Sequence, residues 1–114
     1  MKTIDSIVTQ AAEMATLRRD IHAHPELCFK EVRTAEVVAQ KLTEWGIPIH
    51  RGLGTTGVVG IVKNGTSKRA IGLRADMDAL HMQEFNTFSH ASQHAGKMHA
   101  CGHDGHTAML LAAA

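Results

Sequence analysis

The chain has 114 residues, a length that suits one small domain or part of a larger one. Its residues are 44% hydrophobic and 20% charged, and twelve Lys and Arg against eleven Asp and Glu give a formal charge of +1. This near-balance, without a basic stripe, argues against a nucleic-acid partner. No apolar run approaches the roughly 18 residues that cross a bilayer, and the first residues lack the apolar core of a signal peptide. We therefore expect no membrane partner and a cytoplasmic location.

The first half of the chain predicts two helices. Apolar residues recur at intervals of three and four over residues 4–22, which is typical of an amphipathic helix. Pro25 should end this helix, because proline disfavours helical geometry at the residue before it. A second helix is expected over residues 31–45, with Gly46 as its carboxyl-terminal stop.

Glycines and short apolar runs replace the helical pattern after Pro48. The dipeptide Asn64-Gly65 is a strong hairpin signal, so we expect paired strands over residues 57–63 and 68–75. Residues 76–100 should be irregular, and a last helix should begin near His103. The order of elements predicts an α/β or α+β fold, and because two strands alone are marginally stable, further strands must come from elsewhere.

A dense group of potential metal ligands lies in "KMHACGHDGHTAML", residues 97–110. Cys101 and His103 are separated only by Gly102, whose flexible backbone lets a thiolate and an imidazole face the same divalent ion. In a reducing compartment, a cysteine among histidines indicates metal binding or catalysis rather than a disulfide. An accidental or structural cluster is the alternative. A zinc-ribbon arrangement would need a second ligand pair, for which the chain offers Cys28 with His22 or His24.

Two aspartates, Asp76 and Asp78, occupy alternate positions at the end of the second expected strand. Either carboxylate could bind a metal ion or orient a metal-bound histidine. The alternative is a pair of turn aspartates, one of them in an ion pair with Arg74. His22 and His24 follow the first helix, where they could be ligands but are more often capping residues.

The motifs "RRDIHAHPEL", "GTTGVVGIV", "AIGLRADMDAL" and "GKMHACGHDGHTAMLL", in this order, resemble the hippurate hydrolase and N-acyl-amino-acid amidohydrolase family. This family of dinuclear metallopeptidases includes the aminoacylases and the indole-acetyl-amino-acid hydrolases, and the resemblance covers about residues 17–114. It implies an α/β fold in which residues 1–114 form the amino-terminal part of a zinc-peptidase-like, three-layer catalytic domain. The lid and dimerisation domain of the family is absent from this sequence, so a homo-oligomer is expected only for the complete enzyme.

The resemblance also implies a reaction and its residues. Such enzymes cleave the amide bond of a small-molecule substrate, an N-acyl amino acid, with water activated by two divalent ions, Mn²⁺ or Zn²⁺. The family's metal-binding cysteine and histidine fall on Cys101 and His103. Asp78 corresponds to a catalytic-site carboxylate that lies beside a ligand. Four further residues are expected near the site, by proximity only: Asp76, His99, Asp104 and His106.

The general-base glutamate and the remaining ligands of the family would follow Ala114, so we expect the 114-residue chain alone to be inactive. Two other classes stay open: a non-catalytic truncated remnant, and a small module with a structural metal ion. His81 also stands where the family usually has proline, which frees a backbone N–H and loosens the turn after Asp78.

Overall fold

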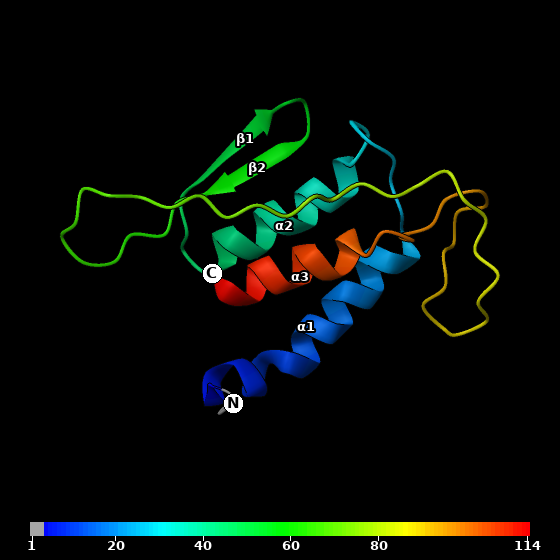
Figure 1. The fold of residues 1–114 in the computed structure, drawn as a ribbon, viewed down its shortest axis with the longest axis horizontal. Coiled ribbons are helices and arrows are strands. Elements are labelled where there is room, and N and C mark those ends of the chain that lie inside the picture. Colours follow the sequence, from blue (N-terminus) through cyan, green and yellow to red (C-terminus); the bar gives the residue numbers. More distant parts are fainter. Residues whose placement is uncertain (1–3) are drawn as a thin grey trace.

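The computed structural model describes residues 4–114, which form three helices and one two-stranded hairpin (Figure 1). In chain order the elements are α1 (Asp5–Ala23), α2 (Val32–Glu44), β1 (Ile49–Leu53), β2 (Gly57–Gly60) and α3 (His103–Ala113). The hairpin lies over one side of α2, while α3 lies between α2 and α1 (Figure 1). The α/β character of the chain and all three predicted helices are thus confirmed.

The hydrophobic core lies where the three helices meet. It is formed by side chains at helical spacing in α1 and α2 and by one residue near the end of α3: Met14, Leu17, Ile21, Val38, Leu42 and Leu111. The apolar pattern at the start of α1 is not used in this way, since Ile4, Ile7 and Val8 are 64%, 47% and 56% exposed. The sequence period therefore predicts the helix correctly, but only its second half is buried.

A remote carboxylate caps the amino terminus of α2. Glu26 accepts hydrogen bonds from the backbone N–H groups of Arg33 and Thr34, at 2.9 and 2.7 Å, and from the Thr34 hydroxyl at 2.7 Å. The first N–H groups of a helix have no partner within the helix, and a negative charge there also suits the helix dipole. Glu26 thereby fixes the turn that follows Pro25 to the second helix.

The predicted strand pairing is wrong. The hairpin that forms joins β1 to β2, antiparallel, with Arg51 opposite Val58 and an irregularity between Arg51 and Leu53. Its turn uses positive φ values at Gly54 and Thr55, 58° and 84°. Residues 68–75 form no strand, and within the described residues they make no ladder with residues 57–63.

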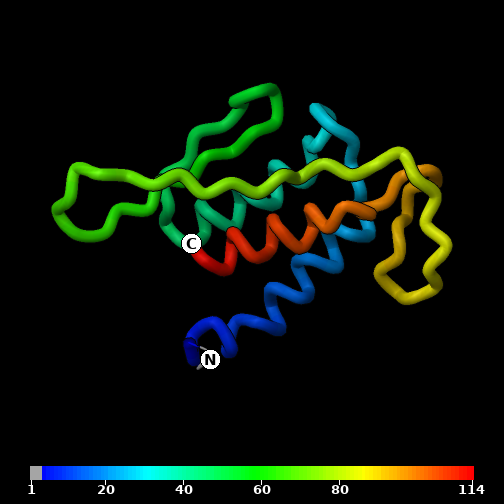
Figure 2. Tube along the Cα trace, in the orientation of Figure 1, coloured from blue at the N-terminus to red at the C-terminus, as the bar shows by residue number. Residues whose placement is uncertain are grey.

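The physical reason is that Asn64-Gly65 specifies a local bend, whereas a strand also needs a hydrogen-bonded neighbour. Gly65 does have a positive φ of 75°. The chain then continues as an extended segment along the length of the molecule, beside α3 (Figure 2). Its apolar side chains are exposed, with Ile71 at 85% and Leu73 at 66%. Within residues 4–114, no helix combines the length and the apolar character needed to span a bilayer.

Replacing Glu26 should destabilise α2. Glu26→Ala removes the acceptor of three hydrogen bonds and leaves helix N–H groups unpaired, so we expect a loss of about 1–2 kcal/mol in the free energy of unfolding. Urea denaturation followed by circular dichroism measures it. Gln40→Ala, on the exposed side of the same helix, should change the midpoint little. Equal midpoints for the two variants would contradict the capping role.

Candidate metal-binding site

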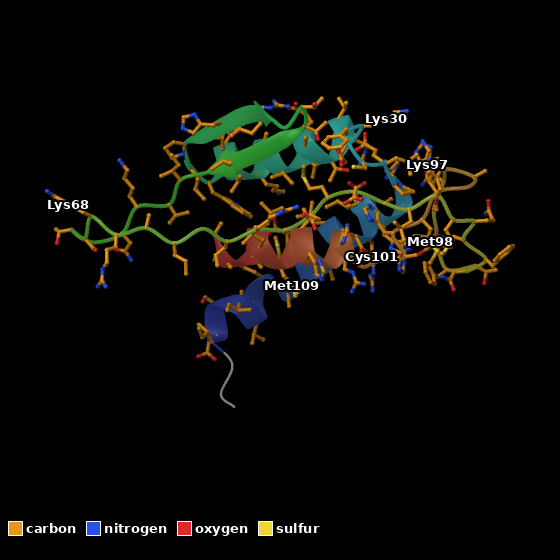
Figure 3. The ribbon with its side chains drawn as sticks, turned by 45° about the horizontal axis from the view of Figure 1, so that its top comes forward. Lys30, Lys68, Lys97, Met98, Cys101 and Met109 are labelled. Atoms are coloured by element: carbon orange, nitrogen blue, oxygen red, sulfur yellow. The ribbon has the colours of Figure 1, made fainter. Side chains whose placement is uncertain are left out.

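The segment that carries Cys101 and His103 is held against the preceding loop before it enters α3. Leu80 and Met98 exchange backbone hydrogen bonds at 3.0 and 3.1 Å. Gly102, with φ of 82°, then turns the chain into the helix. Cys101 is exposed at the beginning of α3 (Figure 3). The left-handed geometry at Gly102 is the conformation that glycine adopts without steric cost, which explains the glycine between the two predicted ligands.

His103 is oriented by Asp78. The ring nitrogen Nδ1 lies 2.9 Å from the Asp78 carboxylate and 2.9 Å from the Asp78 carbonyl oxygen. A carbonyl can only accept a hydrogen bond, so Nδ1 must carry the hydrogen, and in the neutral ring Nε2 keeps its lone pair. A carboxylate that fixes the tautomer of a histidine is the usual arrangement behind a metal ligand. The geometry therefore leaves the lone pair of Nε2 free to coordinate a metal ion.

The His103–Asp78 pair opens into a groove of about 860 Å³ between the hairpin, the extended segment and α3. Asp76 also lines this groove, but its carboxylate is paired with the Arg74 guanidinium at 2.6 and 2.9 Å. The expected ion pair with Arg74 is thus present. Asp76 takes part in the α3 contact through its carbonyl oxygen, which accepts a hydrogen bond from Thr107.

Asp104 has a different set of contacts from the one its sequence position suggests. Its side chain is 1% exposed, and Oδ2 lies 2.9 Å from Nδ1 of His22 and 3.2 Å from Nε of Arg18. Burial alone would raise the pKa of Asp104, but the hydrogen bonds from His22 and Arg18 outweigh it and hold the pKa below its ordinary value. Asp104 thus joins α3 to α1.

His22 contacts a second carboxylate on its other side. Its Nε2 lies 3.2 Å from Glu84, which also accepts hydrogen bonds from Asn86 and from the Ser92 N–H. Burial raises the pKa of Glu84, and the bonds from Asn86, Ser92 and His22 more than reverse this, so the pKa is lowered. Since both nitrogens of His22 face carboxylates, only a doubly protonated ring donates to both.

The other predicted histidines divide into two kinds. His24 caps α1, with Nδ1 at 2.8 Å from the Asp20 carbonyl oxygen, as the capping interpretation expected. His106 is exposed, and its ring centroid lies 5.6 Å from that of His103. His99 is 4% exposed, and neither of its ring nitrogens has a hydrogen-bond partner among the described residues. Burial lowers the pKa of His99, because it disfavours the charged form of the ring.

The sequence did not point to Glu84 or Arg18, which hold the surroundings of the candidate ligands in place. It also did not predict that His22 bridges two carboxylates. Glu84 lies in an irregular polar stretch, where no periodicity distinguishes a buried carboxylate from an exposed one. The adjacent Arg18-Arg19 pair reads as surface charge. A signal could come only from the tertiary contact between α1 and α3.

The donors present fit part of a metal centre. Within residues 4–114 no three His, Cys, Asp or Glu side chains are arranged to hold a metal ion by themselves. Cys101 and His103 nevertheless offer an exposed thiol and an oriented Nε2, with one residue between them in the sequence. Thiolate and imidazole are the donor types of zinc-like ions. The chemistry of these two side chains fits part of a coordination sphere, which would need further donors.

Comparisons with known proteins identify the class to which this arrangement belongs. Residues 72–114 match the sequence profile of peptidase family M20/M25/M40. A crystal structure of the Bacillus subtilis YxeP protein, described as a dinuclear metal-binding peptidase of the M20 family, superimposes with a TM-score of 0.86 at 40% identity. The match covers 91% of this chain and 29% of that one. The chain is similar to M20 family peptidases over most of its length, and the predicted fold class, part of an α/β catalytic domain, is confirmed.

Curated relatives narrow the similarity further. The chain is 50% identical over 114 residues to hippurate hydrolase from Campylobacter jejuni, covering 100% of this chain and 30% of the relative. It is 44% identical to N-acyl-L-amino acid amidohydrolase from Geobacillus stearothermophilus, covering 99% of this chain and 30% of that enzyme. The chain thus spans less than a third of the length of these relatives.

Stability should fall in two steps as the pH is lowered. His99 has a folded-state pKa below its ordinary 6.5, so the unfolded state takes up a proton first and stability decreases below about pH 6.5. Glu84 and Asp104 have folded-state pKa values below their ordinary 4.5 and 3.8, so their contribution is present at higher pH and is lost as the pH falls through the acid range.

Urea denaturation at a series of pH values measures these steps. His99→Gln should remove the upper step and Asp104→Asn should reduce the lower one. His50→Gln, on the exposed face of the hairpin, is the matched control and should leave both steps in place. A free energy of unfolding that stays constant from pH 7 to 5 would contradict the role assigned to His99.

Proposed function

We propose that the chain is part of an amidohydrolase that cleaves the amide bond of N-acyl amino acids such as hippurate. The observation that carries the proposal is the contact of His103 Nδ1 with Asp78 at 2.9 Å, which fixes the tautomer of a histidine two residues after the exposed Cys101. The match of residues 72–114 to the M20 family profile and identities of 50% and 44% to relatives named for these activities support it. The chain would bring half of the metal centre.

In this proposal Cys101 Sγ and His103 Nε2 are metal ligands and Asp78 is the positioning carboxylate behind His103. Bound divalent ions, Mn²⁺ or Zn²⁺, would polarise the amide carbonyl and supply activated water. The neighbouring groove, lined mainly by apolar side chains, would receive the small-molecule substrate. The general base and the remaining ligands would come from residues outside this sequence. We further propose a cytoplasmic location, a homo-oligomer for the complete enzyme, and no nucleic-acid or membrane partner.

A structural metal module receives no support from the geometry. It would need Cys28 with His22 or His24 as a second ligand pair. The Cys28 side chain is exposed, while His22 is engaged with two carboxylates and His24 with the Asp20 carbonyl oxygen. The amidohydrolase proposal uses only donors that the structure leaves available.

Removing the Cys101 thiol should remove a metal ion. Cys101→Ala in the complete enzyme should abolish tight binding of one ion and most activity, because a ligand thiolate is lost. Metal content after dialysis, measured by elemental mass spectrometry, gives the result independently of activity. Cys28→Ala is the matched control and should keep the metal. Full metal content in Cys101→Ala would refute the ligand assignment.

The 114-residue chain alone should hydrolyse benzoylglycine no faster than buffer containing manganese. Within residues 4–114 no three ligating side chains are arranged to hold a metal ion, whereas two-metal hydrolysis requires a full ligand set for both ions. Release of glycine, followed by amine-specific labelling, provides the measurement. Turnover that depends on added metal and disappears in Cys101→Ala would show that the chain carries a complete site.

A further inference from the structure

A buried polar cluster lies beside the proposed metal ligands without being part of them. It consists of His22 from α1, Asp104 from the first turn of α3 and Glu84 from the irregular loop, with Arg18 at its edge. The side chains of His22, Asp104 and Glu84 are only 12%, 1% and 2% exposed. Burying these ionisable groups would be unfavourable unless each was satisfied by its partners. The cluster therefore fixes its three segments to each other.

His22 is the residue that both carboxylates share. Nδ1 contacts Asp104 at 2.9 Å and Nε2 contacts Glu84 at 3.2 Å. Glu84 and Asp104 lie at the two ends of the segment 84–104, and Cys101 and His103 lie between them. The side chain of His22 thus connects the two ends of the segment that contains both proposed ligands.

Glu84 also makes hydrogen bonds within the irregular segment that precedes the proposed ligands. Glu84 accepts hydrogen bonds from the Ser92 N–H at 2.6 Å and from Asn86 at 2.9 Å. The ring centroid of His99, two residues before Cys101, lies 6.2 Å from that of His22. A long irregular segment has many conformations, and ordering it when a ligand binds would reduce affinity. Contacts that order it beforehand should therefore increase affinity.

We propose that His22 is a positioning residue for the metal centre. It holds Glu84 and Asp104 through two hydrogen bonds, without touching the metal, so that Cys101 and His103 are presented in a fixed arrangement. The inference rests on the proposed function, since it requires these two residues to be ligands. Changes to groups that support a ligand from behind commonly reduce metal affinity about 10- to 100-fold. The loss of His22 should have an effect in this range.

Titration of the metal-free complete enzyme with cobalt(II) chloride provides a test that needs no enzymatic activity. Absorption from cobalt–thiolate charge transfer reports binding at Cys101. We expect His22→Ala to weaken cobalt binding about 10-fold or more. His22→Asn should recover most of the affinity, because its amide nitrogen takes the place of Nδ1 and donates to Asp104. His22→Gln should recover less, because its amide reaches Glu84 instead. His24→Asn, at the same end of α1, is the matched control and should bind as the unmodified protein does.

The outcomes separate the inference from the proposed function. Unchanged affinity in His22→Ala would overturn the inference and leave the ligand assignment standing. A folded His22→Ala variant with weak binding that His22→Asn does not restore would also overturn it, since packing rather than hydrogen bonding would then matter. Absence of the thiolate band in the unmodified protein, or its persistence in Cys101→Ser, would refute the ligand assignment and the inference with it. Circular dichroism shows whether His22→Ala folds. If it does not, the test rests on the other two variants: cobalt affinities of His22→Asn and His22→Gln that both equal that of the unmodified protein would overturn the inference.

Discussion

The contact between a buried carboxylate in the first turn of α3 and two side chains of α1 determines how the site is built. Asp104 is 1% exposed, and its Oδ2 lies within hydrogen-bond distance of His22 and Arg18, both on α1. Because a buried carboxylate without such partners would be strongly unfavourable, the first turn of α3 can only lie where α1 offers them. The direction in which α3 leaves the loop, and hence the place of Cys101 and His103, follows from this pairing.

A second carboxylate then decides what His103 can do. Asp78 approaches from the extended segment on the opposite side of the loop and accepts the Nδ1 hydrogen of His103 through both its carboxylate and its carbonyl oxygen. The imidazole is thus fixed in tautomer and in orientation before any ion arrives. Asp104 positions the backbone at the start of α3 and Asp78 positions the His103 side chain, so aspartates from two different sequence motifs serve separate functions.

How far the sequence predicts this arrangement depends on the range of each interaction. The helices follow from local periodicity, and Gly46 and Pro25 mark their ends correctly because those effects act within a few residues. The pairing of Arg74 with Asp76 is equally local. The strand partners were predicted wrongly, because Asn64-Gly65 reports a bend and says nothing about which segment lies alongside. Glu84 and Arg18 could not be predicted at all, because their importance arises from contacts between segments 62 and 86 residues apart.

The difference between local and long-range interactions also accounts for the exposed apolar residues of the extended segment. The extended segment has Ile71 and Leu73 exposed and no ladder partner within residues 4–114, and it borders the groove beside His103. Unpaired strand edges and exposed apolar side chains are unfavourable in water and favour further pairing. At the other end of the groove, Asp78 holds His103 through hydrogen bonds within this chain. The imidazole is therefore positioned by contacts within residues 4–114, while the apolar side chains of Ile71 and Leu73 along the same groove stay exposed.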